Sequence, residues 1–290
     1  MSKNKYLNEI VVAAAQFDVK IFDKKYNFNM MEKMVRETVE KYSADLVVFP
    51  EASAAGYCFH DRTEAEKSAI EENGKEMQQL KKISEELNVS IVFGATEKME
   101  DKLYNSAFFI EPDGKVIKYH KTHLPFLGLD KFVEAGNELA VFETRFGKVG
   151  MIICYDLRFP EPCRELSLKG ARLIIGPTNL PVGGESHLDY FTRARACENR
   201  IFLISCNRCG DERGFHFIGR AQIVDYTGKI LCQAKEESEI IHAKINLALA
   251  EEKNIIVVPN DYETHIFEDR NPSIYGSITA EINADGSLKQ

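Results

Sequence analysis

The sequence has no excess of positive charge and no long apolar run. Its 45 Asp and Glu residues outnumber its 37 Lys and Arg residues, which gives a formal net charge of -8. Because binding to a phosphate backbone depends on clustered Lys and Arg, this balance argues against nucleic acid as a partner. The apolar run near the N-terminus, residues 10–15, is too short to cross a bilayer and lacks the cleavage pattern of a signal peptide. We therefore expect a cytoplasmic protein with neither a nucleic-acid nor a membrane partner.

The chain also lacks a Pro-, Gly- or Ser-rich linker, a block of like charge and a convincing internal repeat. With 290 residues, 44% of them hydrophobic, it is long enough to bury a large core. Because α/β folds of this length commonly form one domain, we expect a single domain over residues 1–290. The seven cysteines, an odd number, suit a reducing compartment and leave at least one thiol for reactivity.

Metal-ligand spacing is missing as well. Cys206 and Cys209 have the C-x-x-C spacing of a redox pair or of half a metal site, but no second Cys pair or His-x₃-His stands at zinc-ligand spacing. We interpret this segment as a strand end that runs into a pocket loop, and we predict no metal and no cofactor.

Hydrophobic periodicity favours an α/β fold. A buried strand at residues 10–16, apolar positions at helical spacing over residues 28–42 and a strand at residues 46–49 form a βαβ unit. The same alternation continues along the chain, with hairpin turns at Gly114, Gly147 and Gly228. We expect a mixed sheet with helices outside it. Further strands are predicted at residues 90–93, 149–153, 173–175 and 201–205, and helices at residues 161–169 and 186–198.

Three short segments place reactive side chains at predicted strand ends. Glu51 ends Val-Val-Phe-Pro-Glu, where burial raises a carboxyl pKa and makes a base, although a helix-capping carboxylate is the alternative. Lys121 directly follows a predicted strand, where its fixed positive charge could stabilise a thiolate or an oxyanion. The alternative is a solvated lysine on the surface. Cys154 leaves an apolar strand near a helix start and a cation, surroundings that lower a thiol pKa, although an inert buried cysteine is the alternative.

Together these segments resemble the nitrilase superfamily, whose members share a Glu, Lys, Cys set in this chain order. Residues 195–199, Gly219 and residues 269–272 also look like family signatures, so the resemblance covers nearly the whole chain. It implies an α/β fold of four layers, an αββα sandwich that commonly dimerises through helices. We therefore expect a homodimer or larger homo-oligomer, with a C-terminal tail from about residue 260 packing at a subunit interface.

The resemblance also implies a mechanism. Glu51 is general base and acid, Cys154 attacks the carbonyl carbon, and Lys121 with the backbone N–H of Tyr155 forms the oxyanion hole. Ammonia or an amine leaves, and water activated by Glu51 hydrolyses the thioester on Cys154. No metal is needed.

The resemblance also implies a second acid, because many members of the superfamily place a glutamate between the lysine and a downstream Phe-x-x-Gly. Here residues 126–131 contain Asp130 but no glutamate. We favour a supporting role for Asp130, which would hold the lysine ammonium and the substrate nitrogen. The alternative is a solvent-exposed Asp130, with Glu134 on a turn.

Several further residues are candidates for the substrate pocket or its support. His120 and His123 flank Lys121, and Arg158 is a possible ligand for a substrate carboxylate. We interpret Arg158 with Glu161, and Arg195 with Glu198, as ionic supports of the cysteine loop. The pocket candidates are Tyr57, His123, Arg158, Thr178, Asn179 and His187.

The leading function is hydrolysis of a small carboxamide, because Cys154 is followed by Tyr155 and Asp156, as in many amidase-like members. True nitrilases of the superfamily typically carry Trp-Glu there. Hydrolysis of an N-carbamoyl amino acid is the main alternative, which an arginine facing the nucleophile would favour. A nitrilase and a non-catalytic member of the fold are the remaining alternatives.

Overall fold

The computed structural model describes residues 6–283 and 287–289. Of the predicted domain over residues 1–290, residues 1–5, 284–286 and 290 therefore lie outside the described residues. The chain divides into two compact units, Met1–Glu251 and Glu252–Gln290. The boundary thus precedes the predicted start of the tail at about residue 260.

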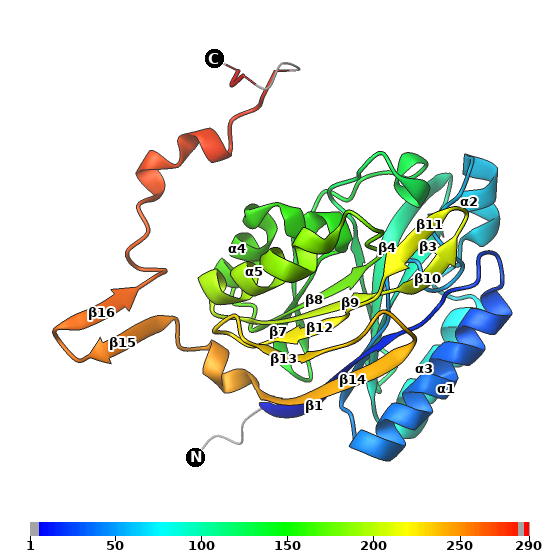
Figure 1. Cartoon of the computed structure of the whole chain (residues 1–290), viewed down its shortest axis with the longest axis horizontal. Coiled ribbons are helices and arrows are strands. Elements are labelled where there is room, and N and C mark those ends of the chain that lie inside the picture. The colour runs from blue at the N-terminus through cyan, green and yellow to red at the C-terminus, as the bar shows by residue number, and fades with distance from the viewer. Residues whose placement is uncertain (1–5, 284–286, 290) are drawn as a thin grey trace. The chain divides into compact units, whose positions relative to one another are not determined.

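The first unit contains two six-stranded mixed sheets (Figure 1). In the first sheet, β1, β2 and β3 are parallel and the remaining neighbours are antiparallel. Its order is β14-β1-β2-β3-β4-β5. The strands are β1 (Glu9–Gln16), β2 (Leu46–Val48), β3 (Ser90–Met99), β4 (Lys102–Ile110), β5 (Val116–His120) and β14 (Glu239–Asn246).

The second sheet repeats this arrangement, with β7, β8 and β9 parallel at its centre and antiparallel neighbours outside them. Its order is β13-β12-β9-β8-β7-β6. The strands are β6 (Val141–Thr144), β7 (Gly147–Met151), β8 (Leu173–Thr178), β9 (Phe202–Asn207), β12 (Gln222–Val224) and β13 (Ile230–Gln233). A separate hairpin pairs β10 (Cys209–Glu212) with β11 (Phe215–Ile218).

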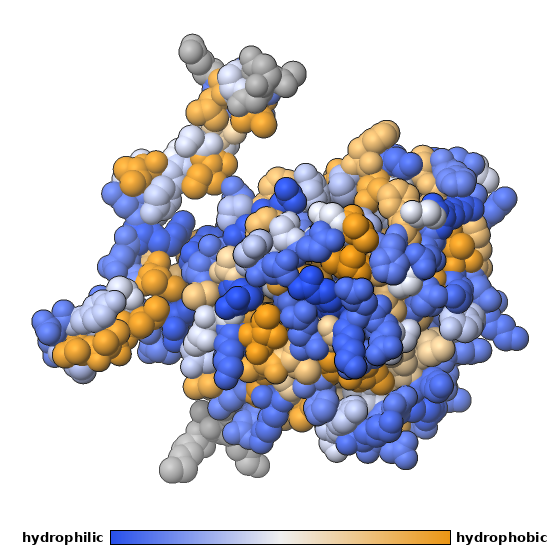
Figure 2. Space-filling model, viewed as in Figure 1, coloured by the Kyte–Doolittle hydropathy of each residue, from blue (hydrophilic) through white to orange (hydrophobic). Residues whose placement is uncertain are grey.

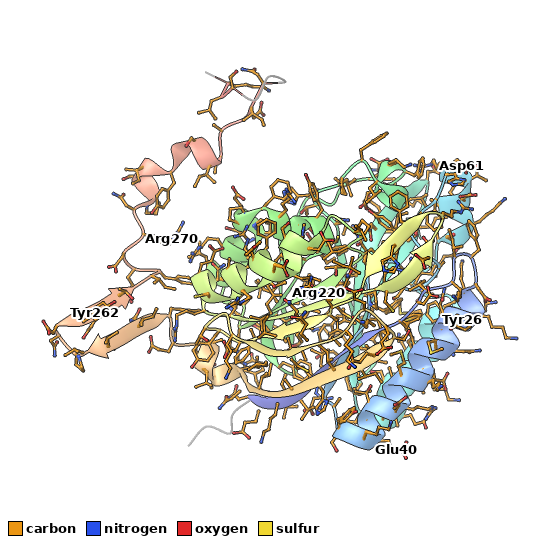
Figure 3. The ribbon with its side chains drawn as sticks, in the orientation of Figure 1. Tyr26, Glu40, Asp61, Arg220, Tyr262 and Arg270 are labelled. Carbon is orange, nitrogen blue, oxygen red and sulfur yellow. The ribbon has the colours of Figure 1, made fainter. Side chains whose placement is uncertain are left out.

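Three apolar clusters hold four layers together. One joins the facing sides of the two sheets, and the others pack helices onto their outer sides. This confirms the expected αββα sandwich; side chains fill the space between the ribbons, and Tyr26 and Glu40 lie toward opposite ends of α1 (Figure 3). The helices are α1 (Lys24–Tyr42), α2 (Arg62–Ser68), α3 (Lys75–Leu87), α4 (Pro160–Leu168) and α5 (Thr192–Asn199).

Two expectations from the sequence need correction. Periodicity along the chain predicted one mixed sheet, whereas β6–β9 belong to a second sheet, because local patterns do not specify which strands pair. The helix predicted over residues 186–198 is a π-helical turn, His187–Phe191, followed by α5. In the part of the chain that is described, no helix combines the length and apolarity that crossing a membrane requires.

The second unit contains a hairpin of β15 (Asn254–Val258) and β16 (Tyr262–His265), followed by two short 3-10 turns, Pro272–Ile274 and Gly276–Ile278. Many of its apolar side chains are exposed, including Ile256 and Ile274. Figure 2 shows apolar residues along this unit.

Candidate active site

Glu51 lies just beyond β2, where β3 approaches it closely. The Gly94 N–H donates to the Pro50 carbonyl over 3.1 Å, and the Gly94 carbonyl accepts from the Ala54 N–H over 3.2 Å. A Cβ atom on Gly94 would lie 2.6 Å from the Glu51 Cα atom, so glycine is needed for this approach. The strand pairing thus fixes Glu51, which is fully buried.

Lys121 directly follows β5, as predicted, and its backbone is held on both sides. Its N–H donates to the Asn105 carbonyl over 2.9 Å, and its carbonyl accepts from the Gly136 N–H over 2.8 Å. The buried ammonium donates to Glu51 Oε1 over 2.7 Å and to Asp130 Oδ2 over 2.5 Å. Lysine has three N–H donors, and these two bonds leave one for another acceptor.

Asp130 is buried against the lysine and has two more partners. Asn105 Nδ2 bridges the two carboxylates, donating to Glu51 Oε1 and to Asp130 Oδ1 over 2.7 Å each. The Tyr57 hydroxyl donates to Asp130 Oδ2 over 2.7 Å. The exposed placement considered as the alternative for Asp130 is therefore wrong, while Glu134 is indeed exposed. One buried network contains both carboxylates and the ammonium.

The loop that carries Tyr57 is anchored by a buried ion pair. Glu212 Oε1, on β10, accepts from the backbone N–H groups of Tyr57 and Cys58 over 2.8 and 2.6 Å. Arg208 donates to the other carboxylate oxygen of Glu212 over 2.7 Å. The hairpin of β10 and β11 therefore supports the network from a distant part of the sequence.

Cys154 begins the 3-10 turn Cys154–Arg158 beyond β7, with a left-handed φ of 44° and 8% exposure. Burial, more than any other influence, raises the pKa of its thiol well above the ordinary value, and Glu51 raises it further. Lys121 and a backbone hydrogen bond from Asn179 act in the opposite direction but do not reverse the shift. The predicted lowering of this pKa is therefore wrong, because desolvation outweighs the cation. The thiol is therefore protonated at neutral pH, and a thiolate would form only if a neighbouring base accepted its proton.

Glu51 has two properties that suit a base. Burial raises its pKa, and Asp130 adds to the rise, while Lys121 opposes it. Its Oε2 atom is buried and has no hydrogen-bond partner among residues 6–283 and 287–289. The pKa of Lys121 is also raised, because the carboxylates of Asp130 and Glu51 more than offset its burial. The ammonium therefore stays charged beside a carboxylate that can accept a proton.

Two pocket candidates present free polar atoms. The side chains of Asn179, just after β8, and His187 are buried, and their polar atoms have no partner within the described residues. Burial lowers the pKa of His187 to about 4, with Arg158 contributing, so its ring is neutral at pH 7. Both side chains can therefore hydrogen-bond a ligand without supplying charge.

The other pocket candidates either have hydrogen-bond partners within the protein or are exposed. The Thr178 hydroxyl donates to Asn207 Oδ1 over 3.1 Å, and His123 Nδ1 lies 2.8 Å from Asp156 Oδ1. Arg158 is exposed, with its guanidinium 5.7 Å from the Phe191 ring centroid. His120 Nε2 lies 2.8 Å from Glu97, outside the lysine network.

One of the two predicted ionic supports is present. Arg195 pairs with Glu198 over 3.2 Å and donates to the carbonyls of Leu157 and Arg158 over 3.3 and 3.2 Å, which confirms its support of the cysteine turn. Within the described residues no ion pair joins Arg158 to Glu161, since Arg158 lies on Phe191 instead.

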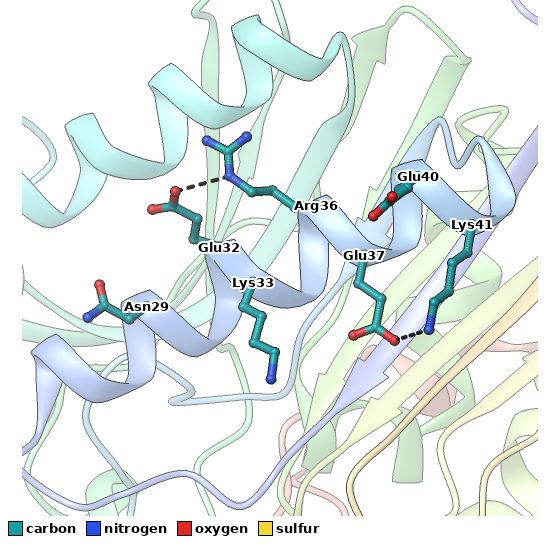
Figure 4. Close-up of a pocket in the computed structure, with 7 residues that line it drawn as sticks. All are labelled: Asn29, Glu32, Lys33, Arg36, Glu37, Glu40 and Lys41. Carbon is teal, nitrogen blue, oxygen red and sulfur yellow. Dashed lines mark hydrogen bonds and ion pairs between the residues drawn. The ribbon is translucent and has the colours of Figure 1, made fainter.

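The described residues outside this network form neither a disulfide nor a candidate metal site. All seven cysteines are free thiols, and no group of His, Cys, Asp and Glu within the described residues could hold a metal ion. A hollow on α1 is lined by charged side chains, including the pairs Arg36–Glu32 and Lys41–Glu37 at 3.2 and 2.6 Å (Figure 4). None of the candidate catalytic residues lines it.

Sequence reasoning missed Asn105 and assigned Tyr57 only as a pocket wall. Asn105 interrupts the otherwise largely apolar strand β4, and a polar residue in a buried strand is a signal for such a network. The contact from Tyr57 to Asp130 joins residues 73 positions apart and leaves no such local signal.

Similar proteins share both the sequence and the fold. Residues 11–254 match the family model described as carbon-nitrogen hydrolase. A Pyrococcus abyssi protein named nitrilase is 38% identical over 272 residues, covering 92% of this chain and 99% of the relative. A Bacillus subtilis 2-oxoglutaramate amidase is 31% identical over 262 residues, covering 88% of this chain and 98% of the relative.

A solved structure agrees with these relatives. Saccharomyces cerevisiae Nit3, described as a member of branch 10 of the nitrilase superfamily, superimposes with a TM-score of 0.75 and 26% identity, covering 87% of this chain and 95% of that one. From the family match, the relatives and the fold, the chain belongs to the carbon-nitrogen hydrolase family of the nitrilase superfamily.

Proposed function

We propose that this protein hydrolyses the carbon-nitrogen bond of a small linear carboxamide through a thioester on Cys154. One observation carries the proposal: among the described residues the buried Glu51 Oε2 atom has no hydrogen-bond partner, and Glu51 belongs to the network whose ammonium and carboxylates influence the pKa of the Cys154 thiol. A protonated thiol, a base and a fixed cation are the groups that acyl transfer to sulfur requires.

The proposed steps use these groups in turn. Glu51 takes the thiol proton as Cys154 Sγ bonds to the carbonyl carbon, and the carbonyl electrons move to oxygen. The remaining N–H of Lys121 and the backbone N–H of Tyr155 stabilise this oxyanion. Glu51 then protonates the nitrogen, the carbon-nitrogen bond breaks, and ammonia leaves.

Hydrolysis of the thioester completes the proposed cycle. Glu51 accepts a proton from water as the water oxygen attacks the thioester carbon. Collapse of this second intermediate breaks the carbon-sulfur bond and returns the proton to sulfur. The products are ammonia and a carboxylic acid.

The two candidate substrate classes, carboxamides and N-carbamoyl amino acids, differ in their acyl group. Neutral His187 and Asn179 suit the uncharged amide group of a substrate, and relatives named 2-oxoglutaramate amidase and omega-amidase support amide hydrolysis whether or not the substrate also carries a carboxylate. Exposed Arg158, whose charge acts on His187, favours a substrate that carries a carboxylate, such as a carboxylate-bearing amide or an N-carbamoyl amino acid.

Ammonia release from a panel of aliphatic amides, carboxylate-bearing amides, N-carbamoyl amino acids and nitriles tests the proposal. We expect turnover of amides, and turnover of nitriles alone would contradict it. Arg158→Gln should raise KM for carboxylate-bearing substrates only, with simple amides as the internal control. An equal change in KM for carboxylate-bearing substrates and for simple amides would show that Arg158 does not recognise the substrate carboxylate.

A further inference from the structure

Asp156, two residues after the nucleophile, has a carboxylate that is saturated with hydrogen bonds. Asp156 Oδ1 accepts from the Thr122 hydroxyl over 2.9 Å, from the His123 N–H over 2.9 Å and from His123 Nδ1 over 2.8 Å. Asp156 Oδ2 accepts from the Tyr119 hydroxyl over 2.8 Å and from the Ile153 N–H over 2.9 Å. The residue is completely buried.

These five bonds come from both sheets of the sandwich. Tyr119 lies on β5 of the first sheet, and Thr122 and His123 follow Lys121 directly. Ile153 lies beyond β7 of the second sheet and directly precedes Cys154. One carboxylate therefore contacts residues on both sides of Lys121 and the residue before Cys154.

The bond to Ile153 also closes a small ring around the nucleophile. Cys154 lies between Ile153 and Asp156 with a φ of 44°, a left-handed conformation that is costly for a residue with a side chain. Such a conformation persists only where surrounding contacts hold it. The Asp156 carboxylate supplies one of those contacts directly.

We propose that Asp156 is a positioning residue, which sets the placement of Cys154 relative to Lys121 by binding both segments through one carboxylate. This inference rests on the proposed function, since it assigns Cys154 and Lys121 to the same reaction. Within the described residues, the Asp156 carboxylate bonds to Tyr119, Thr122, His123 and Ile153, none of whose atoms takes part in the proposed steps.

A carboxylate is required because each of its oxygens faces a backbone N–H. The His123 N–H points at one oxygen and the Ile153 N–H at the other, and neither donor can become an acceptor. In Asp156→Asn, whichever way the amide is turned, one backbone N–H faces an NH₂ group. Either the lysine segment or the cysteine turn loses its anchor.

Asp156→Asn is compared with Glu111→Gln in the full-length protein. Glu111 is also buried, and its Oε1 accepts from the Arg145 N–H over 2.7 Å, so it too joins the two sheets. Glu111 lies at the β4–β5 turn, at the opposite end of β5 from Lys121. The readouts are amide turnover, the rate and pH profile of Cys154 alkylation by iodoacetamide, and Tm.

We expect Asp156→Asn to lower kcat by about a hundredfold with KM changed by less than about threefold, because the groups are misplaced rather than removed. Alkylation of Cys154 should slow by at least about tenfold and its profile should move to higher pH, since displacement of Lys121 weakens the charge effect that lowers the pKa of the thiol. Glu111→Gln should lower Tm while leaving both activities within about threefold of wild type.

Equal kcat and alkylation rates in the two variants would overturn the inference. If Asp156→Asn does not fold, Tyr119→Phe decides, because it removes one donor and keeps the carboxylate. It should lower kcat and alkylation by about three- to tenfold, and unchanged values would overturn the inference. Alkylation needs no substrate, so a wild-type protein that hydrolyses no amide refutes the proposed function while the positioning role is still tested.

Discussion

Asp130 is one methylene shorter than the glutamate expected at its place, yet it reaches the lysine. The short turn Gly128–Lys131 brings its backbone close, and Tyr57 and Asn105 fix its two oxygens. The residue type alone did not show whether the Asp130 carboxylate could reach the Lys121 ammonium, because that distance depends on the path of the backbone.

Asp130→Asn should lower kcat by about ten- to a hundredfold, because it removes one of the two negative charges that hold the Lys121 ammonium. Tyr57→Phe is the matched control, since it removes the hydroxyl contact to Asp130 but keeps both charges. Its loss in kcat should be smaller. Steady-state kinetics on an amide, with circular dichroism to check folding, measures both effects, and an Asp130→Asn protein with wild-type kcat would refute this role.

His187 predicts a specific pH dependence of stability. The unfolded chain protonates this histidine below its ordinary pKa of 6.5, whereas the folded protein does so only below about 4. The contribution of neutral His187 to the free energy of unfolding is therefore complete above pH 6.5, and it is lost as the pH falls toward 4. The loss in the free energy of unfolding is up to about 3 kcal/mol.

Urea unfolding at pH 7 and pH 4.5 measures this loss, and His187→Asn should reduce it. His216→Asn, at an exposed position on β11, is the control and should keep the wild-type difference. If both variants behave alike, His187 is not the source of the pH dependence.

Among the elements, the six parallel strands of the two sheets and the helices α1 and α4 were predicted from the sequence, because their apolar periodicity is strong. The sequence also placed Glu51, Lys121 and Cys154 at strand ends, where the structure has them. It did not predict the π-helical turn before α5, nor the support of Tyr57 by β10. Both depend on tertiary contacts that local patterns do not record.

The close passage of β3 past Glu51 makes Gly94 critical. A Cβ atom there would lie 2.5 Å from the Ala52 nitrogen and 2.6 Å from the Glu51 Cα atom, so Gly94→Ala should push the carboxylate away from Lys121. We expect a loss of kcat of at least about tenfold and a destabilisation of about 1–3 kcal/mol.

Gly176→Ala on β8 is the matched control for this substitution. Its new methyl group would meet nothing closer than 3.4 Å, so kcat should stay within about threefold of wild type. Kinetics and denaturant unfolding of both proteins test the prediction, and equal kcat values would show that the passage does not position Glu51.

At the scale of the whole molecule, the two sheets contribute different parts of the site. Glu51, Asn105 and Lys121 come from the first sheet and its loops, and Cys154 and Asn179 from the second. The resemblance to a known family supplied this four-layer arrangement, whereas periodicity predicted only a mixed sheet. Which strands pair is decided by contacts between residues far apart in the sequence.

The second compact unit, Glu252–Gln290, exposes much of its apolar surface. Ile256, Ile274 and Ile278 are 54%, 71% and 58% exposed. Because exposed apolar surface favours association, we propose that this unit contacts a second copy of the chain in a homodimer or larger oligomer.

Light scattering after size-exclusion chromatography tests this proposal. The wild-type protein should have the mass of an oligomer, and Ile274→Asp with Ile278→Asp should shift it toward the mass of one chain. Glu281→Gln, in the same unit, is the control for a change of charge without loss of apolar surface. A monomeric wild-type protein, or an unchanged mass in the double variant, would contradict the proposal.

The most direct test of the central claim is mass spectrometry of the protein quenched during turnover of an amide. We expect an acyl adduct on the peptide that contains Cys154, its disappearance as substrate is consumed, and neither adduct nor turnover in Cys154→Ala. That substitution removes the nucleophile with little change in volume, so the variant should stay folded. Amide turnover by Cys154→Ala near the wild-type rate, or an acyl group bound at another residue, would contradict the account.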